Sequence, residues 1–174
     1  MKKLTLVVLA LALLESPAVV LENAKLAIEI DEVELAVRSV VNKTAGGVRF
    51  VEGNEGPGCW SATFRRVADG CEFTGDDTSG AQVRRIERHD DGGATLVWEG
   101  VDLPDAPAAL IVRSTISFTE EGDSRWSLNI ENRSAAYGLW ETRYPILRTV
   151  TLPGESDLLQ PRPDTGAKLL KAYR

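Results

Sequence analysis

Apolar side chains recur at every second position along much of this chain, and this period constrains its fold more than any other feature. The alternating runs are Leu26, Ile28 and Ile30; Trp60, Ala62 and Phe64; Leu110, Val112, Ile116 and Phe118; and Trp126, Leu128 and Ile130. A period of two places such residues on one face of an extended strand. Each run therefore predicts a β-strand with one buried face and one wetter face.

Turn-forming residues separate these runs. Glycine, often with aspartate or asparagine, clusters at 46–47, 53–58, 69–70, 75–80, 91–93 and 121–123. Strand-sized segments at this spacing favour antiparallel hairpins over βαβ units. We predict an all-β fold, an antiparallel β-sandwich, with meandering hairpins over 83–88, 94–98, 110–119 and 124–131. Pro104 and Pro107 make 106–109 read as a loop.

The segment 21–41 is compatible with two readings. Its residues Leu26, Ile30, Val33, Val37 and Val40 also form a helical stripe. The alternation within 26–30 favours a strand, and we interpret the segment as one.

The first residues have the three parts of a secretory signal. Lys2 and Lys3 precede the apolar run 4–14, and Ser16-Pro17-Ala18 supplies small residues for cleavage. The run is shorter than the about 20 residues that a membrane-spanning helix needs. We therefore expect a signal peptide over 1–18, a secreted or periplasmic domain over 19–174, and no membrane association after cleavage. The alternative is a short buried helix at the true N-terminus.

The composition is that of a folded, acidic domain. The 174 residues are 43% hydrophobic and carry a formal charge of −6, and a chain of this length usually forms one domain. An acidic surface repels phosphate backbones, so we expect no nucleic-acid partner.

Cys59 and Cys71 are the two cysteines of the chain. In an oxidising compartment they could form a structural disulfide around the expected strand 60–64, which we favour. Two free buried thiols are the alternative, because spacing alone does not show that two cysteines come within bridging distance.

No complete catalytic constellation is present. The sequence has no HExxH, GxSxG, CxxC or phosphate-loop motif, so we expect neither a metal site nor a cofactor. Glycoside hydrolysis needs two carboxyl groups across the scissile bond, and none of the 26 acidic residues stands out as such a pair. His89 is the sole histidine, and we interpret it as a surface residue at a hairpin end.

The aromatic residues divide into two groups. Trp60, Trp98 and Trp126 alternate with other residues of strand-like runs, which is typical of core positions. Tyr137 and Trp140 instead fall in the polar stretch 132–142. An exposed indole beside carboxylates and arginine is what a sugar-binding surface requires.

The chain resembles a known type of domain, most clearly over 126–170. Trp126–Ile130, the segment Trp140-Glu141-Thr142-Arg143-Tyr144-Pro145 and the Pro/Gly-rich connector after it are similar to the N-terminal, galactose-mutarotase-like β-supersandwich domain of certain secreted glycoside hydrolases. Residues 21–30 and 38–47 resemble its first strands, although the usual glycine turn is here Asp31-Glu32-Val33-Glu34.

This resemblance implies a non-catalytic accessory domain that precedes a (β/α)8 barrel absent from this chain. It implies that the domain packs on that barrel, within one polypeptide, and helps shape a carbohydrate site. Trp140, Glu141, Arg143 and Tyr144 would then line the edge of the substrate cleft, or pack against the barrel. The chain alone is not expected to be an enzyme.

Two alternatives remain. One is a free-standing secreted module that binds carbohydrate or another partner. The other is an aldose epimerase or polysaccharide lyase on the same fold, which in its epimerase form requires a cleft with His89 facing a carboxylate.

Overall fold

The computed structural model describes residues 17–52, 59–147, 157–162 and 166–171, and all its regular elements there are β-strands. The strands are β1 (Ala18–Glu22), β2 (Leu26–Asp31), β3 (Val37–Asn42), β4 (Val48–Glu52), β5 (Ser61–Arg66), β6 (Glu72–Asp76), β7 (Val83–Arg88), β8 (Ala94–Leu103), β9 (Ala106–Phe118), β10 (Ser124–Asn132), β11 (Tyr137–Arg143), β12 (Asp157–Arg162) and β13 (Gly166–Lys171). The predicted all-β fold is confirmed.

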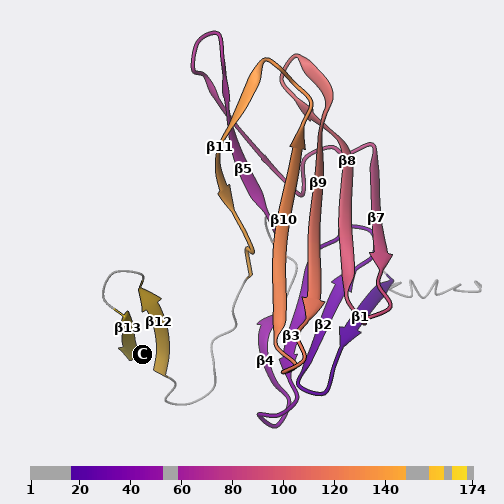
Figure 1. Cartoon of the computed structure of the whole chain (residues 1–174), viewed down its shortest axis with the longest axis vertical. Coiled ribbons are helices and arrows are strands. Elements are labelled where there is room, and N and C mark those ends of the chain that lie inside the picture. The colour runs from indigo at the N-terminus through magenta and orange to yellow at the C-terminus, as the bar shows by residue number, and fades with distance from the viewer. Residues whose placement is uncertain (1–16, 53–58, 148–156, 163–165, 172–174) are drawn as a thin grey trace, which may run out of the picture.

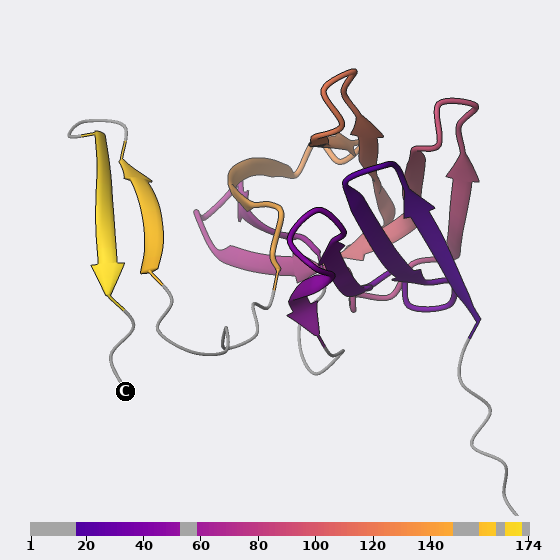
Figure 2. The same cartoon turned by 90° about the horizontal axis from the view of Figure 1, so that it is seen from below.

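Every strand pairing between these elements is antiparallel. The sheets have the orders β1-β2-β3-β4, β10-β9-β8-β7 and β11-β5-β6, and β12 pairs with β13. Figure 1 shows β7–β10 as the long sheet, with β1–β4 behind its lower part and β5 and β11 beside its upper part. Figure 2 shows these layers from below. The molecule is thus an antiparallel β-sandwich, as predicted.

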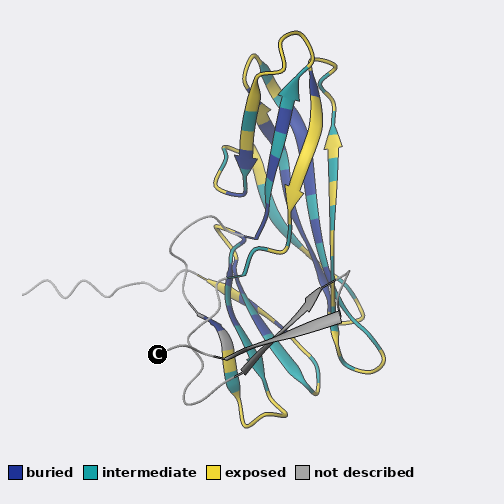
Figure 3. Ribbon diagram, turned by 90° about the vertical axis from the view of Figure 1, so that its left-hand side faces the viewer, coloured by how far each residue is buried: buried dark blue, intermediate teal, exposed yellow. Residues whose placement is uncertain are grey.

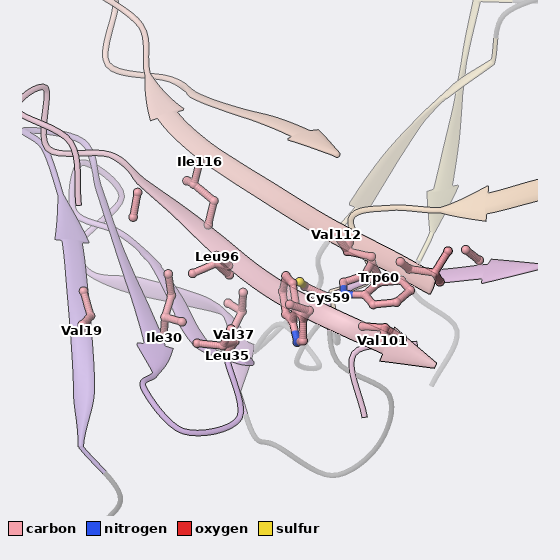
Figure 4. Close-up of a cluster of buried hydrophobic side chains, with 14 of the residues drawn as sticks. Val19, Ile30, Leu35, Val37, Cys59, Trp60, Leu96, Val101, Val112 and Ile116 are labelled. Atoms are coloured by element: carbon pink, nitrogen blue, oxygen red, sulfur yellow. The ribbon is translucent and has the colours of Figure 1, made fainter. Parts of the chain in front are cut away.

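One hydrophobic core joins the three sheets. It contains side chains from β1, β2, β3, β5, β8 and β9, and Figure 4 shows Val19 and Ile30 of one sheet facing Leu96 and Ile116 of the other. Trp60 and Trp98 are fully buried, with ring centroids 5.9 Å apart in an edge-to-face arrangement. Their predicted core positions are confirmed. Trp126 is partly buried and packs on the core from the edge strand β10.

Polar turns close the two ends of the sandwich. At one end the Asn23 side chain donates to the carbonyl of Gly122 at 2.9 Å, which joins the β1–β2 and β9–β10 turns. At the other end Arg66 lies 3.8 Å from the Asp105 carboxylate of the β8–β9 turn. Figure 3 shows buried residues concentrated within the strands, although β7, β10 and β11 also carry exposed residues along their length.

The structure answers two questions of local structure, at segments 21–41 and 106–109. The segment 21–41 forms strands and turns, because Ile28 and Ile30 point into the core at alternate positions. The prediction of a loop at 106–109 was wrong, since β9 begins at Ala106. Pro107 is accommodated because the β8–β9 register is irregular beside it, with shifts between Glu99 and Val101 and between Val101 and Leu103.

Most of the expected signal peptide, 1–16, lies outside the described residues. Ala18, the expected cleavage position, is the first residue of β1 and pairs with Asp31. Within the described part of the chain no helix is long and apolar enough to cross a membrane.

Candidate functional site

A β-bulge in β11 creates the most distinctive surface of the sandwich. Leu139 pairs with Phe64 and Glu141 pairs with the adjacent Thr63, so Trp140 is an extra residue between them. Phe64 is fully buried, which assigns its row of the sheet to the inner face. The bulge therefore adds an aromatic residue while the residues before and after it keep the same alternation between the two faces as their partners on β5.

The strand register defines which residues share the outer face of the sheet β11-β5-β6. Three cross-strand rows lie on that face: Gly138, Arg65 and Glu72; Glu141, Thr63 and Thr74; and Arg143, Ser61 and Asp76. Residues between them, such as Ala62 and Phe64, are buried in the core. We call these rows, together with Trp140, the outer face.

Trp140 is the largest exposed hydrophobic side chain there, with 61% of its surface accessible. The guanidinium carbon of Arg65 lies 3.4 Å from the centroid of its ring. Glu72 holds the same guanidinium from the next strand, with Nε and Nη2 at 2.8 and 2.7 Å from Oε1. Arg65 thus packs on one side of the indole and is fixed by a carboxylate.

Polar side chains surround this pair. Arg143 Nε donates to Glu141 Oε1 at 3.1 Å, and the hydroxyls of Thr63 and Thr74 lie 3.4 Å apart across two strands. Trp140, Glu141 and Arg143, which the sequence singled out, are therefore brought together on one surface with Arg65 and the threonines. The arrangement offers an aromatic plane, hydroxyls and ion-paired charged groups.

The structure separates Tyr144 from the other three predicted residues. It follows β11, packs against the core, and its phenol oxygen lies 2.9 Å from Ser114 Oγ of β9. Burial raises the pKa of Tyr144 to about 12. Its side chain ties the end of β11 to the long sheet and does not contribute to the outer face.

The predicted disulfide is not formed, and both cysteines are free. The Arg66 N–H donates to the carbonyl of Cys71 at 2.9 Å, which closes the β5–β6 hairpin. Cys59 lies beyond the opposite end of β5, where its N–H donates to Asp77. Cys59 and Cys71 are therefore separated by about the length of β5, which is roughly 20 Å at about 3.3 Å per residue. A disulfide needs Cα atoms within about 7 Å.

The polar contacts of His89 lie within its own β7–β8 hairpin. Its Nε2 lies 3.0 Å from Thr95 Oγ1, and its Nδ1 lies 3.9 Å from Asp91 in the turn of its own hairpin. A cavity of about 260 Å³ is lined instead by Val19, Glu32, Ile86 and Arg88, between the edge strands β1 and β7. No group of three or more metal-ligating side chains occurs among the described residues.

Arg65, Thr63 and Glu72 were missed as site residues from the sequence. The signal that could have found Arg65 and Thr63 is their alternation with the buried Ala62 and Phe64, which assigns them to the opposite face. Their proximity to Trp140 depends on the β5–β11 pairing across about 75 residues, which no local pattern specifies.

Comparison with known proteins gives no family assignment: no protein-family model matches this chain, and no curated protein sequence matches it significantly.

Proposed function

We propose that this chain is a non-catalytic β-sandwich module that binds carbohydrate through its outer face. The observation that carries the proposal is Trp140, 61% exposed among paired polar residues on an ordered sheet. A sugar ring presents apolar C–H groups on its faces and hydroxyls at its edge. An indole plane beside threonine hydroxyls and carboxylates complements both.

The wider setting is part of the same proposal. The signal-like N-terminus supports export, and the resemblance of 126–170 supports an N-terminal accessory domain of a secreted glycoside hydrolase. In that setting the module packs on a catalytic barrel of the same polypeptide and helps shape its carbohydrate site. The chain itself supplies no hydrolytic pair on this face, because Glu72 and Glu141 are each ion-paired with an arginine.

A second role for the same strand is contact with that barrel. Leu139 and Trp140 are adjacent exposed hydrophobic residues, 46% and 61% accessible. Exposed apolar residues of this kind often mark a partner surface. In this case a barrel added as a separate protein would bury Trp140 and lower its accessibility to solvent, whereas added glycans would leave it unchanged.

Replacement of Trp140 tests the proposal. Trp140→Ala should weaken polysaccharide binding about tenfold or more, because stacking on the indole is lost, while the unfolding midpoint stays close to that of the parent. Affinity electrophoresis and isothermal titration measure the binding. Leu139→Ala is the matched control, since it removes a neighbouring exposed apolar side chain from the inner-face row. Equal binding by parent and Trp140→Ala would overturn the proposal.

A further inference from the structure

We infer that the outer face selects a neutral polysaccharide, with Arg65 as a positioning residue for Trp140. This inference deepens the proposed function and rests on it. It concerns the charge of the ligand and the residue that prepares the aromatic plane.

The charge balance of the outer face argues against an anionic ligand. Its two cations, Arg65 and Arg143, are already paired with Glu72 and Glu141 at 2.7 and 3.1 Å. The third carboxylate, Asp76, accepts hydrogen bonds from Thr78 and from the Ser79 N–H. With three carboxylates against two arginines, the face repels uronates and sulfates, and a neutral glycan avoids that repulsion.

The same pairing explains how Trp140 is prepared for stacking. Arg65 covers one side of the indole at 3.4 Å from its centroid, and Glu72 prevents the guanidinium from swinging away. The ring is restrained before a ligand arrives, which lowers the entropy cost of binding. Trp140 is still 61% accessible with Arg65 in place, so a ligand can reach it.

The shape of the surface favours a polymer over a single sugar. The outer face runs across three strands, about 4.8 Å apart, and the Thr63 and Thr74 hydroxyls continue it beyond the indole. A glycan chain lying across the strands would stack one ring on Trp140 and donate hydrogen bonds from the next units to these oxygens.

A panel of polysaccharides tests the ligand class. The full chain is run in native gels containing xylan, β-glucan, galactomannan, polygalacturonate or alginate, at low and high NaCl. We expect retardation by at least one neutral polymer, none by the acidic polymers, and less than about a twofold change with salt, because paired charges are not displaced. Salt-sensitive retardation by acidic polymers alone would overturn this inference and leave the proposed function standing. No retardation by any polymer would overturn both.

A pair of arginine variants tests the positioning role. Arg65→Met should weaken binding of the neutral polymer about fivefold or more. It should also increase acrylamide quenching of the indole, because Trp60 and Trp98 are buried, Trp126 is partly buried, and Trp140 is 61% accessible. Arg85→Met is the matched control, since the side chain of Arg85 is 40% accessible, as is that of Arg65, and it is also ion-paired with glutamate, here Glu87 and Glu99. Parental affinity and parental quenching in Arg65→Met would overturn the positioning role.

Discussion

The two cysteines occupy opposite environments. Cys59 is 1% exposed, and burial together with the Asp77 carboxylate raises the pKa of its thiol far above the ordinary value. Cys71 is exposed in the β5–β6 turn, where its N–H donates to Asp69. The protonated, buried Cys59 thiol is a poor nucleophile, whereas solvent reaches Cys71.

Thiol titration of the native protein should therefore detect one cysteine. With Ellman's reagent we expect about one thiol per chain before denaturation and about two afterwards, without reductant, since only Cys71 is accessible. The Cys71→Ser variant is the control and should show no fast thiol. Two thiols that appear only after reduction would show that a disulfide forms.

Close strand approach at the start of β8 depends on one glycine. A Cβ at Gly93 would lie 2.4 Å from the carbonyl oxygen of Ile116 and 3.2 Å from the Cα of Ser117. Both contacts are with the backbone of β9, which is held in the centre of the long sheet. The pairing of β8 with β9 therefore has no room for a side chain here.

Gly93→Ala should destabilise the fold by about 2 kcal/mol, because the backbone of β8 or β9 must shift. Urea unfolding followed by tryptophan fluorescence measures the change. Gly80→Ala is the matched control, since a Cβ there meets no atom within 4 Å. Equal midpoints for the two variants would contradict the close approach.

Elements stabilised by contacts between residues near in sequence could be predicted, whereas features that depend on distant strand pairing could not. Hairpins such as Val83–Arg88 with β8 were predicted because alternation and the 91–93 turn are local. The loop expected at 106–109 was wrong because a strand paired irregularly on one side tolerates Pro107. The disulfide failed for a related reason: Cys59 and Cys71 flank a strand, and their distance follows from the hairpin register. Local alternation with Ala62 and Phe64 assigns Arg65 to the outer face, but its position beside Trp140 depends on the long-range β5–β11 pairing, which no local pattern encodes.

At the scale of the whole molecule, the packing of the sheets keeps two ionisable groups protonated, the Tyr144 phenol and the Cys59 thiol. Ser114 Oγ lies 2.9 Å from the Tyr144 hydroxyl, and burial raises the pKa of both Tyr144, to about 12, and Cys59. In the unfolded chain these groups ionise near their ordinary values of 10.0 and 9.0. Above pH 9 the native state therefore binds more protons than the unfolded state.

The free energy of unfolding should consequently be at its full value below about pH 9 and fall as the pH rises toward 12. Urea unfolding at a series of pH values measures this decline. Tyr144→Phe should flatten it between about pH 10 and 12, because one of the linked protons is removed. Tyr137→Phe controls for the loss of a hydroxyl from another tyrosine of the core. An identical slope in Tyr144→Phe and the parent would contradict the linkage.

Because Trp140 is the extra residue of a β-bulge, it can be gained or lost without changing which residues of β11 pair with β5. Leu139 and Glu141 already oppose the consecutive residues Phe64 and Thr63, so a strand without Trp140 would form an unbroken ladder with the same inward side chains. A single inserted codon thus suffices to add the indole, and a single deletion to remove it. Related chains could gain or lose this aromatic platform in one step while keeping the same interior.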